Sequence, residues 1–121
     1  MHRDMLYIGG SWTESKGGGK IHVENPTTRE IIGSVPEGTL EDVDAAVFAA
    51  RDAFEEWSNS PIKERIRLLN SLSESFKNRT NELAEIITKE VGTPIEYSKM
   101  AMVGTPRVVT RSYAKMLESY N

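Results

Sequence analysis

The apolar positions in the first third of the chain alternate with polar ones, as in half-buried strands. Residues 6–13 place the pair Gly9-Gly10 between aromatic residues, and glycine adopts the positive φ angles that a two-residue hairpin turn requires. Residues 21–24 alternate in the same way, and residues 30–35 are rich in β-branched side chains. The pattern therefore predicts a tight hairpin followed by a second pair of strands.

From Thr39 onward, apolar residues recur every three or four positions, the period of a helix with one apolar face. Such a stripe over residues 43–57 predicts a long helix that Thr39 caps, with acidic residues in its first turn. A second stripe runs over residues 62–76, and Pro61 is expected at the first helical position, where its missing N–H costs nothing. Two long helices are therefore expected here.

The last third predicts further helices with an interruption. A third helix over residues 81–91 should end at Gly92, which suits the left-handed conformation of a helix terminus. Residues 93–96 match a capping box with proline at the first position, so a fourth helix should begin there. Residues 104–106, Gly-Thr-Pro, should kink or break it, and helical spacing resumes over residues 109–120.

The order of these elements predicts an α+β fold class, with N-terminal β-hairpin strands followed by about four α-helices. We assign strands and turns to residues 1–38 and the helical part to residues 39–121. The helical pattern still runs at Asn121 without a stop signal, so we expect the chain to be truncated.

Composition excludes several classes of protein. The 121 residues are 38% hydrophobic and 27% charged with a net charge of −3, which gives no broad positive field for nucleic acid. No apolar run approaches the length of a signal-peptide core or a membrane span, so no membrane partner is expected and the cytoplasm is the predicted location. The sequence contains no cysteine, which excludes disulfides and a thiolate nucleophile within it.

Short motifs supply no catalytic centre. The run Gly17-Gly18-Gly19-Lys20 lacks the flanking residues of a phosphate-binding loop, and a flexible hairpin loop is the better interpretation. His22 lies on the polar side of a predicted strand, and no second group is placed to form a catalytic pair with it. We therefore assign no catalytic residue and no cofactor-binding residue to this chain.

Several short motifs occur in an order that resembles the N-terminal segment of the aldehyde dehydrogenase superfamily. Each is weak alone, whereas their order and spacing together are specific; they are residues 7–12 (YIGGSW), 23–28 (VENPTT), 33–57 and 62–92. The resemblance implies a fragment of an α/β enzyme, residues 39–121 being an incomplete part of its cofactor domain. That family oxidises aldehydes to carboxylic acids with NAD(P), using a cysteine nucleophile and a glutamate base that match nothing within this chain. The chain alone is therefore expected to be inactive.

The same resemblance implies one candidate site. Some family members hold a monovalent cation through oxygen atoms, and the matching positions are Val23, Glu24 and Glu90. A solvated or capping role for Glu90 is the simpler alternative.

Two kinds of partner are expected. As an enzyme segment, the chain should associate with the rest of the enzyme or with itself through exposed helix faces. The alternative is a stand-alone interaction or oligomerisation module that regulates or caps a full-length relative. A small-ligand binder that uses the apolar helix faces is a third hypothesis.

Overall fold

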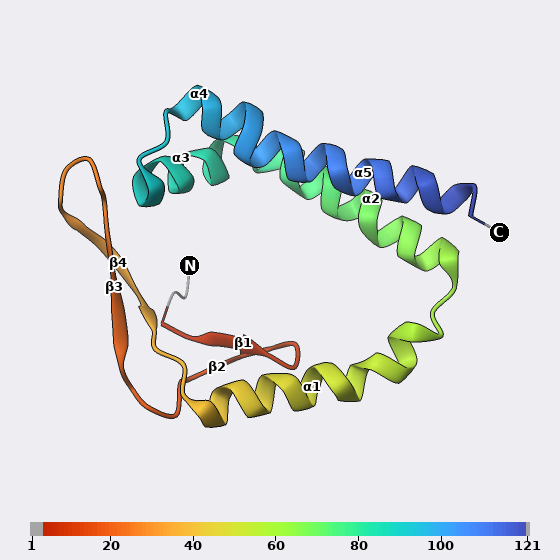
Figure 1. Cartoon of the computed structure of the whole chain (residues 1–121), viewed down its shortest axis with the longest axis horizontal. Coiled ribbons are helices and arrows are strands. Elements are labelled where there is room, and N and C mark those ends of the chain that lie inside the picture. The colour runs from red at the N-terminus through yellow and green to blue at the C-terminus, as the bar shows by residue number, and fades with distance from the viewer. Residues whose placement is uncertain (1–3, 121) are drawn as a thin grey trace. The chain divides into compact units, whose positions relative to one another are not determined.

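The computed structural model describes residues 4–120 and divides into two compact units, residues 1–59 and 60–121. The first unit contains four strands and one long helix, and the second contains the remaining helices (Figure 1). The predicted α+β class, strands first and helices after, is confirmed. The predicted division into residues 1–38 and 39–121 separates the strands from the helices, whereas the two compact units meet at residue 59. That division stays a prediction.

The first two strands form the predicted hairpin. Strand β1 (Leu6–Ile8) pairs antiparallel with β2 (Ser11–Thr13). Gly9 and Gly10 have φ angles of 59° and 81°, as the two-residue turn requires. The hairpin rests on the first helix, because a Cβ at Gly9 would lie 3.6 Å from the Cβ of Ala49.

The next two strands form a separate antiparallel ribbon. Strand β3 (Lys20–Glu24) pairs with β4 (Ile31–Pro36), and the register shifts after Val23. In the turn between them, Asn25 Oδ1 accepts a hydrogen bond from the Thr27 amide at 2.9 Å. This side-chain turn is the local reason that the chain reverses here, as the sequence predicts.

Helix α1 (Leu40–Ser58) begins where the sequence places it. The Thr39 hydroxyl accepts the Asp42 amide at 3.2 Å, and the Asp42 carboxylate accepts the Thr39 amide at 2.9 Å. This reciprocal capping box satisfies two amides that a helix start otherwise leaves without partners. Thr39 is therefore confirmed as the N-cap.

The regular elements of the second unit, within the described residues, are all helical. Its elements are α2 (Ile62–Asn78), α3 (Thr80–Val91), the short α4 (Ile95–Tyr97), the π-helix η1 (Ser98–Val103) and α5 (Gly104–Glu118). Figure 1 shows α5 running beside α2, and these two helices form the most extensive contact within the unit.

Small residues make this helix packing close. Ala84 on α3, Val103 at the end of η1 and Ala114 on α5 are each at most 2% exposed. Buried Ser73 on α2 donates its hydroxyl proton to the Arg107 carbonyl at 3.1 Å, which ties α2 to α5. Small side chains let helix backbones approach closely, so the core of this unit consists of a few small buried residues.

Two predicted helix starts are wrong by one residue. Pro61 and Pro94 are the N-cap residues of α2 and α4, with ψ angles of 143° and 137°, rather than the first helical residues. No side-chain cap forms at α4, so the expected capping box involving Thr93 is also wrong. The prediction for Gly92 is confirmed, since it ends α3 in the left-handed conformation with φ 77°.

The predicted interruption near Pro106 is a change of helix type rather than a break. Backbone helicity continues from α4 through η1 into α5, and the Gly104 amide donates to the Lys99 carbonyl in the five-residue pattern of a π-helix. Proline has no amide proton and its ring clashes with the carbonyl four residues earlier. The wider turn of η1 lies just before Pro106, and backbone helicity continues through this proline.

Candidate functional site

The most highly connected polar group of the first unit is the carboxylate of Asp42. Asp42 is only 5% exposed. Besides the capping contacts with Thr39, it accepts the Ser15 hydroxyl at 2.9 Å and the Lys16 amide at 3.2 Å. It therefore joins the start of α1 to a loop 26 or 27 residues earlier in the chain.

These hydrogen bonds favour the charged form of Asp42. The Thr39 amide is the largest influence, and the bonds from Ser15, the Thr39 hydroxyl and the Lys16 amide add to it. Together they outweigh desolvation and lower the pKa of Asp42 from 3.8 to about 2. Because these hydrogen bonds hold a buried, charged carboxylate at the start of α1, we interpret Asp42 as a structural anchor.

Two glycines of the run beside this anchor, Gly17 and Gly19, lie close to neighbouring side chains. A Cβ at Gly17 would lie 2.7 Å from the Thr39 side chain, and one at Gly19 would lie 2.5 Å from the Glu37 carboxylate. The Glu37 amide donates to the Gly19 carbonyl at 2.8 Å. The glycines allow this close approach, and the carboxylate of Asp42 occupies the helix start where an anion would otherwise bind.

Sequence reasoning missed this anchor. It treated Asp42 only as a negative charge near the helix dipole, although Asp42 lies three residues after Thr39, the spacing of a capping box. That spacing could have predicted the local half of the network. Its long-range half, the contacts with Ser15 and Lys16, has no local signal.

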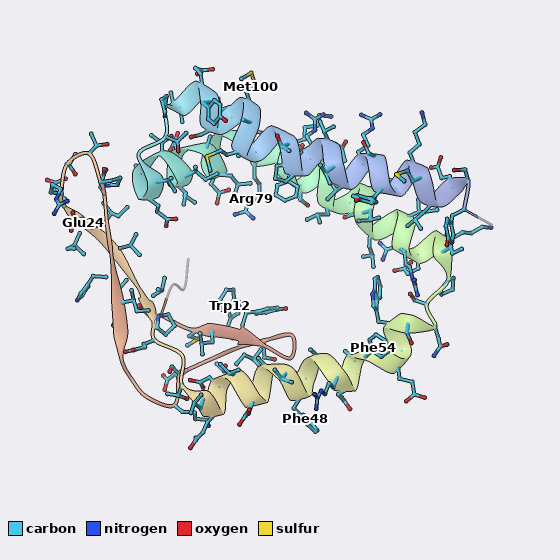
Figure 2. The ribbon with its side chains drawn as sticks, in the orientation of Figure 1. Trp12, Glu24, Phe48, Phe54, Arg79 and Met100 are labelled. Atoms are coloured by element: carbon cyan, nitrogen blue, oxygen red, sulfur yellow. The ribbon has the colours of Figure 1, made fainter. Side chains whose placement is uncertain are left out.

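The residues of the predicted cation site lie in different units. Val23 and Glu24 end β3 in the first unit, whereas Glu90 lies in the last turn of α3 in the second. The Glu24 carboxylate is engaged by Arg29 Nε at 2.8 Å, and Arg29 has a φ angle of 65° (Glu24 is labelled in Figure 2). The site therefore stays a prediction.

The described part of the chain offers little else that could form a metal site or a membrane span. Residues 4–120 contain no group of three or more His, Cys, Asp or Glu side chains placed to hold a metal ion. In the same residues, no helix combines the length and apolar character needed to cross a membrane.

Exposed apolar side chains are the dominant surface feature. On α1, Phe48 is 73% exposed, Phe54 67% and Leu40 85%. Figure 2 shows Phe48 pointing away from α1 and Trp12 on the hairpin. The rings of Trp12 and Tyr7 contact each other in a tilted arrangement, with centroids 5.1 Å apart and an interplanar angle of 58°. Large exposed apolar patches are typical of protein–protein or membrane interaction sites and of ligand-binding grooves.

The second unit has an exposed apolar stripe of its own, on α5. Its members are Val108, Val109, Tyr113 and Met116, which are 44–63% exposed. Two open depressions, of about 340 and 500 Å³, lie along the end of this helix. Because their lining residues come from residues 112–120 alone, they are surface hollows rather than an enclosed binding pocket.

Comparison with known proteins identifies the family. The model of the aldehyde dehydrogenase family matches residues 12–121. The "Putative aldehyde dehydrogenase" of Staphylococcus haemolyticus is 42% identical over 93 residues, covering 77% of this chain and 20% of that protein.

Solved structures of similar proteins have the same fold in this region. An aldehyde dehydrogenase from Bartonella henselae superimposes with a TM-score of 0.93 at 26% identity, covering 98% of this chain and 25% of that one. Betaine aldehyde dehydrogenase from Staphylococcus aureus, solved with NAD+, gives a TM-score of 0.89 at 31% identity, covering 94% and 23%.

The chain thus spans about a fifth to a quarter of the length of these relatives, and its strands and helices match their N-terminal region. The sequence-based resemblance is confirmed: the chain belongs to the aldehyde dehydrogenase family.

Proposed function

We propose that this chain is the N-terminal structural part of an NAD(P)-dependent aldehyde dehydrogenase that oxidises aldehydes to carboxylic acids. Its role there is to support the cofactor domain and to offer subunit surface. The main support for the proposal is the exposure of α1. On this helix only Asp42 is buried and only Ala49 is half-buried, although the fold of the chain matches that of aldehyde dehydrogenases.

The chemistry of aldehyde oxidation explains why the chain needs further polypeptide. Oxidation through a thioester requires a thiolate that attacks the carbonyl carbon, and the sequence contains no cysteine. Hydride transfer requires a bound nicotinamide dinucleotide, and the glycine motif that cradles such a cofactor is absent from residues 1–121. Both functions therefore belong to polypeptide outside these residues.

The test is an activity measurement on the purified 121-residue chain. With aldehyde and NAD+ or NADP+, we expect no reduced cofactor above the background reaction. Mixing the chain with the remaining portion of a related aldehyde dehydrogenase should restore activity, and the Ala114→Leu variant, which disturbs the packing of α5 on α2, should restore less. Turnover by the chain alone would contradict the proposal.

The cation site is part of the same proposal. Carbonyl oxygens of Val23 and Glu24 together with the Glu90 carboxylate form a donor set that suits a hard monovalent cation. In the reassembled enzyme, exchanging potassium for sodium should change the melting temperature, and Glu90→Gln should abolish that difference while Glu85→Gln on the same helix preserves it. An unchanged response in Glu90→Gln would remove the site from the proposal.

The second candidate is a stand-alone interaction module that regulates or caps a full-length relative. The exposed stripe on α5 favours it, because such a stripe can bind another chain. The reading frame after Asn121 separates the candidates: a continuing frame with a cysteine motif supports the enzyme segment, and an immediate stop codon supports the module. A cytoplasmic location belongs to both candidates.

A further inference from the structure

The inward side of the last helical segment changes its spacing once, at η1. From α4 into α5, the buried or half-buried residues on this side are Ile95, Ser98, Val103, Arg107, Thr110 and Ala114. Their steps are three or four residues long, as in a helix with one buried side, except for a single step of five. That step runs from Ser98 to Val103, which are the bounds of η1.

A regular α-helix would not keep both ends of this step on one side. At about 3.6 residues per turn, five residues advance by about 500°, so Val103 would lie about 140° around the helix from Ser98. A regular helix would instead turn the fourth residue after Ser98 inward, and that residue, Met102, is exposed. Ser98 and Val103 are 0% and 2% exposed. Both are buried because a π-helical turn places residues five apart above one another.

Hydrogen bonds tie the two ends of this segment to different helices. At the start of the wide turn, Ser98 Oγ lies 3.0 Å from Thr88 Oγ1, which joins η1 to α3. After the turn, the Arg107 carbonyl accepts the Ser73 hydroxyl at 3.1 Å, which joins α5 to α2. Each bond fixes the side of the helix that faces inward at its own position. The extra residue between them lets both bonds form on one continuous helix.

The residue that follows the turn, Gly104, suits the wide form. Its amide donates to the carbonyl of Lys99, five residues earlier, and to that of Ala101. A Cβ at Gly104 would lie 3.3 Å from the Lys99 carbonyl oxygen, which is a tight contact with backbone. Because glycine has no Cβ, it allows this close approach of two backbone segments.

We propose that η1 is a register-setting device: it holds one residue more than a regular helix needs, and this residue turns the inward side of α5 toward α2. The device is local, because the steps are regular on both sides of it. Removing one residue from the turn leaves Ser98 and Val103 four apart, the spacing at which an α-helix keeps two residues on one side. The inference concerns packing within the second unit and does not depend on the proposed enzyme role.

Two single-residue deletions test the device. Met100, 72% exposed, lies inside the turn, and Val108, 63% exposed, lies in α5. Without Met100, the turn should become regular and the helix should pack as before. Without Val108, the positions after it rotate by about 100°, so Ala114 leaves the inward side. Thermal unfolding followed by circular dichroism should place the chain lacking Val108 at least about 8 °C below the chain lacking Met100.

Two further comparisons separate the device from other causes of instability. Proline strains a regular helix, so the two deletions are also compared with Pro106→Ala in both chains. Gly104→Ala should raise the melting temperature of the chain lacking Met100, because alanine favours an α-helix, and should not raise that of the full chain. Equal melting temperatures of the two deletion variants in the Pro106→Ala background would overturn the proposal. An equal gain from Gly104→Ala in the full chain and in the chain lacking Met100 would also overturn it.

Discussion

The two units of this chain are ordered by different interactions. In the described part of the first unit, the one buried residue is an ionised aspartate, Asp42, which amides and hydroxyls from the helix start and a distant loop hold in place. In the second unit the buried side chains are small, and Ala84, Val103 and Ala114 allow helices to pack closely. Directional hydrogen bonds stabilise the first unit, and close packing of small side chains stabilises the second.

Because of this difference, different kinds of substitution should destabilise the two units. A hydrogen-bonded anchor responds to charge and to protonation, because its donors remain in place but lose their acceptor. A packed interface of small side chains responds to added volume, because its neighbours cannot move apart without losing contact. Perturbations can therefore be chosen that affect one unit and spare the other.

Asp42→Ala is expected to have the largest effect. It removes the acceptor shared by Ser15, Lys16 and Thr39, so the loop should detach and the start of α1 should fray. Hydrogen exchange should show complete loss of protection at the Lys16 and Thr39 amides. Asp44→Ala, two residues along on the exposed surface, is the matched control and should leave that protection intact; equal losses would refute the anchor.

Ala114→Leu should destabilise the second unit by about 1–3 kcal/mol, because the larger side chain is forced into the close contact of α5 with its neighbours. Urea unfolding followed by circular dichroism measures the change. Ala53→Leu adds the same atoms to the exposed surface of α1 and should cost far less. If both variants lose equal stability, the contrast between the units fails.

Acid should weaken the first unit before the second. Because folding lowers the pKa of Asp42 from 3.8 to about 2, its stabilising contribution is complete above 3.8 and is lost as the pH falls toward 2. Both tryptophans, Trp12 and Trp57, lie in the first unit, so their fluorescence reports it selectively. Asp42→Asn should remove this part of the acid transition, and an unchanged transition in that variant would contradict the assignment.

The smallest expected effect concerns Arg29, held at a φ angle of 65°. Arg29→Gly relieves this strain but loses the exposed ion pair with Glu24, so we expect a gain of at most about 0.5 kcal/mol. Gly10→Ala, at a φ angle of 81°, should instead lose about 1 kcal/mol. Thermal unfolding of the two variants checks the opposite signs; a loss in Arg29→Gly would mean that the ion pair outweighs the strain.

Features set by neighbouring residues were predictable from the sequence. Thr39 begins a helix and Gly92 ends one because their own backbone and side-chain chemistry suits those positions. Gly9 and Gly10 likewise specify their turn. The order of such features also sufficed to suggest the family.

Features that join distant segments were not predictable. The bond between Ser15 and Asp42 spans 27 residues and follows no local pattern. No local pattern in the sequence indicates that the helix widens into a π-helical turn before Pro106 rather than breaking there, and the structure shows that turn over Ser98–Val103. The cation site suggested by the family resemblance stays a proposal, because Val23 and Glu24 lie in one unit and Glu90 in the other.

The wide helical turn over residues 98–103 has a consequence for alignment with relatives. A π-helical turn contains more residues than an α-helical one, so it changes the rotational phase of everything that follows it. Ala114 reaches the buried side of α5 in the phase that this turn sets. A relative whose helix lacks the wide turn should therefore align with this chain only if a one-residue gap is placed within 98–103, and a gap placed later would pair inward residues with outward ones.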